Sequence, residues 1–172
     1  MRVNQRYDFT CTWSMPAPPE VLYQTLERLD LYPQWWRQVK LAQRIDDDTC
    51  RVVVQSRLPI ALRITAHRSR ADAGAGLLEA RLTGDLVGYS RWQLTAARGG
   101  GTTVAFSEEV EAARPLLRRL AFARPLFEVN HRLMMNSGER GLRAHLVRRC
   151  PLPGVRGATP GDPYVTGAPD LK

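Results

Sequence analysis

Residues 7–36 read YDFTCTWSMPAPPEVLYQTLERLDLYPQWW, a pattern that changes character twice. In its first nine residues polar and apolar side chains alternate, which is typical of a strand with one buried face. The prolines at 16, 18 and 19 end that strand. Because proline is tolerated in the first turn of a helix, we expect a helix to follow as far as about Leu29. The aromatic run after it cannot continue this helix past Pro33. The predicted inward face of the strand comprises Tyr7, Phe9, Cys11, Trp13 and Met15.

Six further strands are predicted between residues 39 and 110, where short alternating runs are separated by turn-forming residues. The turns fall at the three aspartates 46–48, at Pro59, at the Ala-Gly repeat 73–76 and at the glycines 99–101. The predicted strands are Val39–Ile45, Arg51–Arg57, Ile60–Arg68, Leu77–Leu82, Asp85–Ala96 and Thr102–Val110. One face of the last two strands comprises Leu86, Gly88, Ser90, Trp92 and Leu94 together with Val104, Phe106, Glu108 and Val110.

A long helix is predicted over Arg124–Arg149, preceded by a shorter helical stretch over Leu116–Ala123. The long helix would measure about 39 Å, enough to cross a small sheet. Helical projection predicts one inward arc on it, made of Leu126, Asn130, Leu133, Met134, Ser137, Gly141 and Ala144, with Phe127 and His145 at its edge.

This order of elements predicts an α+β fold of one seven-stranded antiparallel sheet, two short helices after the first strand and a long C-terminal helix. The sheet is expected to curve around the long helix. Small residues on the two facing surfaces, such as Gly88, Ser90 and Ser137, would leave a cavity between them.

The length of 172 residues suits one domain over residues 1–149. The remaining 23 residues hold five prolines and four glycines, so we expect 150–172 to be a flexible tail. No apolar run reaches the ~18–20 residues that cross a bilayer, and no secretory signal is recognisable. Three widely spaced cysteines offer no disulfide framework, so we expect a reducing, cytoplasmic location.

The net charge of +8 is concentrated in one segment, because residues 114–149 hold nine arginines against Glu128 and Glu139. Such a segment would allow weak contact with anionic surfaces, while the alternative is an ordinary solvated helix face. It lacks the interleaved aromatic residues that stack on bases, so no nucleic-acid partner is expected.

Motifs of the well-marked enzyme classes are absent from the sequence. It holds no nucleophile elbow, no phosphate-binding loop and no spacing of histidine or cysteine typical of a metal site. The aspartates 46–48 suit a solvated hairpin turn. We therefore expect neither a metal nor a cofactor.

Five segments resemble a known family: 15–22 MPAPPEVL, 31–36 LYPQWW, 56–63 SRLPIALR, 83–92 TGDLVGYSRW and 124–131 RPLFEVNH. They are similar to bacterial members of the START-like (SRPBCC) superfamily, which includes the polyketide cyclase/dehydrase and lipid-transport proteins. The resemblance covers about residues 5–148. It implies a helix-grip fold in which Trp92, Glu108 and the long helix face a central cavity. It leaves the activity open, because this superfamily includes carriers, cyclases, hydrolases and sensors.

Glu108 is the candidate catalytic residue, because it lies on an apolar strand face between Phe106 and Val110. Burial disfavours a charged carboxylate unless a cation pairs with it, and such groups serve as acids, bases or ligand anchors. Alternatively, a bulge turns Glu108 outward toward Glu109 and Glu111.

Several other residues are candidates for ligand contact. Asn130 could bond a ligand carbonyl or, equally, a neighbouring backbone group, whereas His131 suits a surface or structural role. Trp35 and Trp36 are expected to close the cavity mouth, one inside and one exposed, with core packing as the alternative. The predicted ligand-binding set is Trp13, Trp35, Trp36, Ile60, Gly88, Tyr89, Ser90, Trp92, Phe106, Leu126, Asn130, Leu133, Met134 and Ser137.

The favoured function is binding of a small hydrophobic or aromatic molecule, lipid or polyketide-like, by a carrier or sensor. Glu108, Asn130 or Tyr89 would set the orientation of the ligand. The alternative is an aromatase/cyclase-type enzyme with Glu108 as the acid or base. The oligomeric state is left open by the sequence.

Overall fold

The computed structural model describes residues 6–55, 60–113 and 124–149. The predicted short helix over 116–123 and the predicted tail over 150–172 lie outside these residues. Within them, no helix combines the length and the apolar character needed to cross a membrane.

The predicted α+β fold is confirmed. The elements are β1 (Arg6–Met15), α1 (Pro19–Glu27), the 3₁₀ helix η1 (Leu29–Gln34), β2 (Val39–Arg44), β3 (Thr49–Gln55), β4 (Ala61–Asp72), β5 (Leu77–Gly84), β6 (Leu86–Ala96), β7 (Thr102–Ala112) and α3 (Arg124–Arg149). The seven strands form one antiparallel sheet in the order β1-β7-β6-β5-β4-β3-β2. Neighbouring strands follow one another in the chain except β1, which joins β7.

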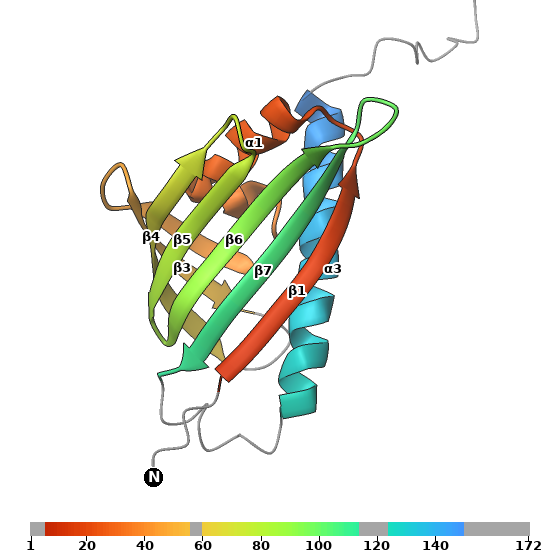
Figure 1. Cartoon of the computed structure of the whole chain (residues 1–172). Helices are drawn as coiled ribbons and strands as arrows, with labels where there is room; N and C mark the ends of the chain where they lie inside the picture. The colour runs from red at the N-terminus through yellow and green to blue at the C-terminus, as the bar shows by residue number, and fades with distance from the viewer. Residues whose placement is uncertain (1–5, 56–59, 114–123, 150–172) are drawn as a thin grey trace, which may run out of the picture.

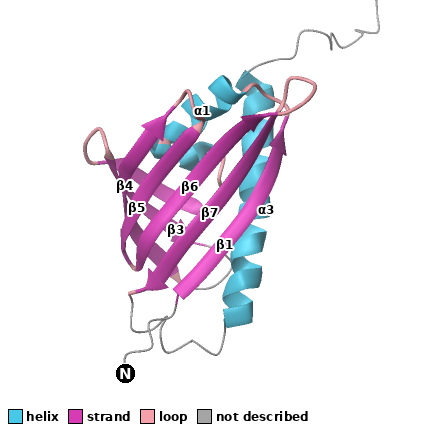
Figure 2. Ribbon diagram, in the orientation of Figure 1, coloured by secondary structure: helices cyan, strands magenta, loops and turns pink. Residues whose placement is uncertain are grey.

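The sheet bends strongly, and the helices lie on its inner face (Figures 1 and 2). Two register shifts contribute to this curvature, one in β2 between Val39 and Leu41 and one in β4 between Arg68 and Arg70. Pairing with β5 continues beyond the second shift to Asp72, so β4 ends four residues later than predicted. The other differences at strand ends are one or two residues.

The alternation of inward and outward side chains was predicted correctly on the strands that face the helices. Trp13 and Met15 of β1 are buried, as are Trp92 and Leu94 of β6. Pairing along β7 is continuous with both neighbours and contains no register shift, so Glu108 lies on the inner face and the outward alternative is excluded.

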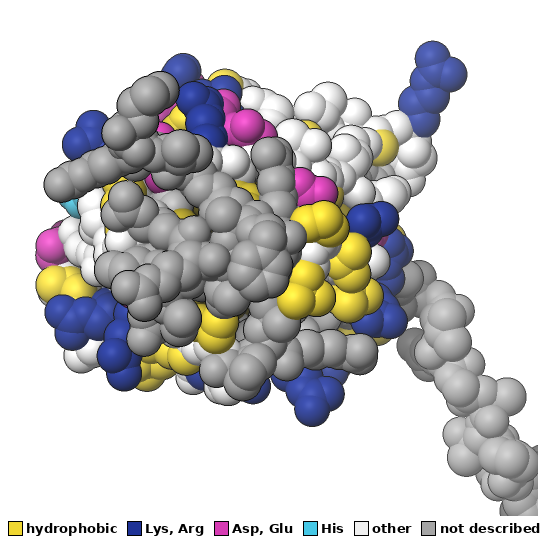
Figure 3. Space-filling view, turned by 90° about the horizontal axis from the view of Figure 1, so that it is seen from below, with side chains coloured by type: hydrophobic (Ala, Val, Ile, Leu, Met, Phe, Trp, Pro, Cys, Tyr) yellow, Lys and Arg dark blue, Asp and Glu magenta, His cyan; other side chains and the backbone are white. Residues whose placement is uncertain are grey.

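The predicted inward arc of α3 was wrong by about one residue. Leu126 and Leu133 are 52% and 46% exposed, and Ala144 is also exposed. The buried side of the helix instead comprises Met135, Gly138, Leu142, His145 and Leu146. Figure 3 views the molecule from the end where β1 and α3 begin, where a group of hydrophobic side chains is exposed among lysines and arginines.

Two glycines allow α3 to lie close to the segment after η1. A Cβ atom at Gly141 would lie 1.8 Å from the carbonyl oxygen of Trp35, and one at Gly138 would lie 2.7 Å from the Trp36 ring. The Trp36 indole Nε1 also donates a hydrogen bond of 3.1 Å to the carbonyl of Met134. Trp35 and Trp36 are both buried, so the prediction that one of them is exposed was wrong.

The core has two parts. The larger part surrounds the four tryptophans and includes α1, η1 and the C-terminal half of α3. The smaller part lies at the other end of the sheet and comprises Tyr7, Ile64, Ala66, Leu82, Val110 and Ala112. Residues of both parts line one cavity.

Candidate functional site

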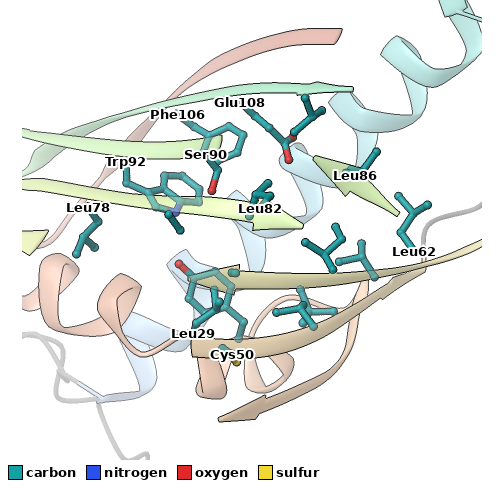
Figure 4. A pocket seen from close by; sticks show the side chains of 18 of the residues that line it. Leu29, Cys50, Leu62, Leu78, Leu82, Leu86, Ser90, Trp92, Phe106 and Glu108 are labelled. Atoms are coloured by element: carbon teal, nitrogen blue, oxygen red, sulfur yellow. The ribbon is translucent and has the colours of Figure 1, made fainter. Parts of the chain in front are cut away.

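A cavity of about 280 Å³ lies between the sheet and the helices. Its volume is at the lower end of the range found for small-molecule sites. Apolar side chains form most of the wall, including Leu62, Leu78, Leu82 and Leu86 from three neighbouring strands (Figure 4). A wall of this kind favours a compact apolar ligand, because binding removes apolar surface from water.

One side of the cavity is aromatic. Trp92 and Phe106 lie side by side on β6 and β7, with ring centroids 4.4 Å apart. Tyr32 and Trp36 contribute from η1 and the segment after it. These rings offer flat apolar surfaces, which suits an aromatic ligand.

Tyr32 contributes its ring to the wall, and its hydroxyl is engaged by the backbone. Its hydroxyl donates a hydrogen bond of 2.8 Å to the carbonyl of Leu26. Complete burial raises the pKa of this hydroxyl far above its ordinary value. Burial likewise raises the pKa of the Cys50 thiol, which also lines the cavity. Neither group is therefore an activated nucleophile at neutral pH.

Among the described residues, an ionisable pair on β7 and α3 lines the cavity. Glu108 Oε2 lies 3.2 Å from His131 Nε2, and each side chain is only 12% exposed. The His131 ring stacks on Phe9 with centroids 3.9 Å apart and an interplanar angle of 8°. This stacking fixes the imidazole in the plane from which it meets the carboxylate.

Neutral polar residues line the cavity as well, among them Ser90 and Asn130. Ser90 is paired directly with Glu108 across β6 and β7, so their side chains share the inner face. Figure 4 shows the oxygen atoms of both side chains directed into the cavity. With His131, these residues form a set that we call the polar cluster: Ser90, Glu108, Asn130 and His131.

Charged residues line the cavity near α1 and the turn between β2 and β3, and we call this part the rim. Arg68 connects the two elements, because its Nη1 lies 3.0 Å from Glu27 Oε1 and its Nε lies 3.5 Å from Asp48 Oδ1. Its Nη2 also donates to the carbonyl of Asp47 over 2.9 Å. All of these side chains are partly exposed or exposed, which places the rim at the surface.

The structure brings together eight of the predicted ligand-binding residues and Glu108. At the cavity wall lie Trp36, Ile60, Ser90, Trp92, Phe106, Asn130 and Met134, and Gly88 lies on the same face of β6 as Ser90 and Trp92. Of these, Gly88 does not itself line the cavity. A Cβ atom at this position would lie 2.0 Å from the carbonyl oxygen of Glu109, so the absence of a side chain at Gly88 allows β6 and β7 to lie close together.

Other predicted residues lie elsewhere. Trp13 and Trp35 pack in the core behind the cavity wall, and Ser137 is partly buried on α3 outside the lining. Leu126 and Leu133 are exposed. Tyr89 lies on the outer face of the sheet, where its hydroxyl donates to Glu109 and the guanidinium of Arg91 lies 5.9 Å from its ring. An anchoring role for Tyr89 inside the cavity is therefore wrong.

His131 was not among the predicted site residues, although it contacts Glu108. Its position is predicted by the spacing of the buried side of α3, since Phe127, His131, Met134 and Met135 recur at intervals of three and four residues. Tyr7 and Phe9 were also missed as lining residues, although both belong to the correctly predicted inner face of β1.

Comparisons with known proteins agree with this architecture. The family model described as polyketide cyclase / dehydrase and lipid transport matches residues 15–136. A comparison with functionally curated proteins finds no match.

Several solved structures share the fold. The protein TTHA0849 from Thermus thermophilus is 17% identical, with a TM-score of 0.73 over 83% of this chain and 99% of its own. The Zhui aromatase/cyclase from Streptomyces sp. R1128 is 12% identical, with a TM-score of 0.71 over 84% of this chain and 96% of its own. A START superfamily protein from Mycobacterium smegmatis is 15% identical, with a TM-score of 0.61 over 83% of this chain and 99% of its own.

At these identities the structures establish the fold alone, whereas the family model covers more than half of the chain. The chain therefore belongs to the polyketide cyclase / dehydrase and lipid transport family, whose START-like fold it shares.

Proposed function

We propose that the protein binds a small hydrophobic or aromatic molecule in the cavity, as a carrier or sensor. The observation that supports this most directly is the cavity itself, whose wall is mostly apolar, with the polar cluster on one part of the wall and further charged residues at the rim. Burial of apolar ligand surface contributes about 25 cal/mol per Å² before the costs of binding are subtracted. A few polar groups are enough to orient such a ligand.

Filling the cavity is expected to abolish binding. Ala80 of β5 lines the cavity, so Ala80→Phe places a ring where the ligand would lie. Native mass spectrometry of protein purified at low salt should show a hydrophobic adduct on the wild type and none on Ala80→Phe. Solvent extraction then identifies the bound molecule.

Ala105→Phe is the matched control, because Ala105 of β7 is exposed on the outer face of the same sheet. This variant should keep the adduct. If Ala80→Phe folds and retains the same adduct, the ligand binds outside the cavity and the proposal is wrong.

The Glu108–His131 pair supports a second candidate, an aromatase/cyclase-type enzyme. A carboxylate in a shielded cavity can remove a proton from a methylene group between two carbonyls of a poly-β-keto chain. The resulting enolate carbon attacks another carbonyl of the same chain, which forms a carbon–carbon bond and an alkoxide. Protonation of the alkoxide and loss of the hydroxyl as water then give the unsaturated ring. The steps need no external oxidant or reductant.

The two candidates differ in whether the ligand changes. Incubation of the protein with a synthetic poly-β-ketone and mass spectrometry of the extract should show, for the enzyme, a product lighter by one water. Glu108→Gln should lose this turnover while its circular dichroism spectrum stays unchanged. Recovery of unaltered ketone from the wild type, bound in stoichiometric amount, would reject the enzyme and retain the carrier.

A further inference from the structure

The polar cluster combines hydrogen-bonding groups of different kinds at one place on the cavity wall. Ser90 and Glu108 come from paired positions of β6 and β7, and Asn130 and His131 come from α3 opposite them. Trp92 and Phe106 flank the strand residues two positions away on the same face. A ligand that reaches the cluster therefore meets aromatic rings beside it.

The cluster offers a carboxylate oxygen that no described residue engages. Glu108 Oε2 is engaged by His131 Nε2, and Oε1 of the same carboxylate remains for a ligand. A carboxylate only accepts hydrogen bonds, whereas the hydroxyl of Ser90 and the amide of Asn130 can both donate and accept. The cluster is therefore complementary to a ligand group that donates one hydrogen bond to Glu108 and accepts another.

No described residue supplies a free cation at the cluster. Among the described residues that line the cavity, the arginines are Arg44, Arg68 and Arg70, and each lies within 4.0 Å of a carboxylate of its own. His131 is the one lining side chain at the cluster that can become cationic, and it is already bonded to Glu108. None of the described lining residues offsets the repulsion between Glu108 and an anionic ligand group, which disfavours binding of such a group.

We infer, on the basis of the proposed binding function, that the ligand is a neutral hydroxylated aromatic molecule of the phenol class. Its hydroxyl donates to Glu108 Oε1 and accepts from Ser90 or Asn130, and its ring lies against Trp92 and Phe106. Carboxylic acids of similar size are rejected by the charge of Glu108.

Three probes share a naphthalene ring and differ in the group at position 2: 2-naphthol, 2-methoxynaphthalene and 2-naphthoate. They test separately the hydrogen bond donated to Glu108 and the exclusion of a negative charge. Isothermal titration calorimetry on the full chain should give a dissociation constant for 2-naphthol about 10- to 100-fold lower than for 2-methoxynaphthalene, since a hydrogen bond to a charged group is lost. The dissociation constant for 2-naphthoate should be the highest of the three.

Glu108→Gln should reduce the preference for 2-naphthol over 2-naphthoate at least tenfold, because the repulsive charge is gone. Glu109→Gln is the matched control, since Glu109 is the next residue on β7 and lies on the outer face with Tyr89. It should leave all three constants unchanged. If Glu108→Gln does not fold, Glu108→Leu replaces it, and the same loss of preference for 2-naphthol over 2-naphthoate is expected.

The outcomes separate this inference from the function on which it rests. Equal binding of the three probes, or tightest binding of 2-naphthoate, would overturn the phenol inference and leave hydrophobic binding intact. If none of the probes binds, both the inference and the proposed function are contradicted for ligands of this size.

Discussion

Gly141→Ala is expected to lower the free energy of unfolding by about 3 kcal/mol. This value is near the upper end of the destabilisation typical when extra atoms are forced into a packed core. The alanine Cβ would lie 1.8 Å from the carbonyl oxygen of Trp35, a backbone atom that cannot rotate away. Relief requires α3 or the segment around Trp35 to move, and both belong to the larger core.

The sign of this effect is informative, because helix propensity alone predicts the opposite. Alanine is favoured over glycine in a helix interior by about 1 kcal/mol. Urea unfolding followed by tryptophan fluorescence measures the difference, and the midpoint should fall without a change in slope. Gly74→Ala is the control, since the nearest atom to its Cβ would be 3.6 Å away. A more stable Gly141→Ala protein would show that α3 does not approach Trp35 this closely.

The second large effect is expected at the Glu108–His131 pair. His131→Leu leaves a mostly buried carboxylate without its partner, and breaking a buried pair by removing one member costs about 3 kcal/mol. Replacing both members by apolar residues restores most of that loss. The double variant Glu108→Leu/His131→Leu should therefore be more stable than His131→Leu alone.

A double-mutant cycle in urea checks this expectation, with a coupling free energy of at least about 1 kcal/mol between the two positions. His131→Phe distinguishes the contribution of the Nε2 contact with Glu108 from that of ring stacking, because phenylalanine can still stack on Phe9 but lacks Nε2. It should be destabilised almost as much as His131→Leu. Additive single effects within about 0.5 kcal/mol would mean that the two side chains do not interact.

The inner face of the sheet could be predicted from the sequence because strand alternation is strict. On β7 the period of two places Val104, Phe106, Glu108 and Val110 on one side, and nothing in the structure interrupts it. The position of Glu108 at the cavity follows from this period once pairing on both sides is continuous. Where one face is buried along the whole strand, the local sequence pattern is sufficient to predict which side chains face inward.

The buried face of α3 could not be predicted in the same way. Apolar residues occur on both sides of this helix, with Leu126 and Leu133 exposed and Leu142 and Leu146 buried. Its rotation is set by close contact of Gly138 and Gly141 with two tryptophans from the N-terminal part of the chain. Glycines contribute no apolar signal, so a projection of the helix alone misses the face that they define.

The contact between Glu108 and His131 could not be predicted from local sequence either, because it depends on how α3 packs against the sheet. His131 is not part of the predicted inward arc, and the observed rotation of α3 turns it toward the carboxylate. Its ring plane is then fixed by Phe9, from the far end of the chain.

The order of strands in the sheet has a consequence for how the chain folds. Strands β2 to β7 form successive hairpins and can pair soon after each is synthesised, whereas β1 must wait for β7, since Arg6 pairs with Glu111. Closing a loop of this length costs entropy and slows the step that contains it. Although β1 is synthesised before the other six strands, its apolar face of Tyr7, Trp13 and Met15 is thus among the last to be covered. A nascent chain that stops before β7 would expose this face, so we expect truncated products to aggregate or to require a chaperone.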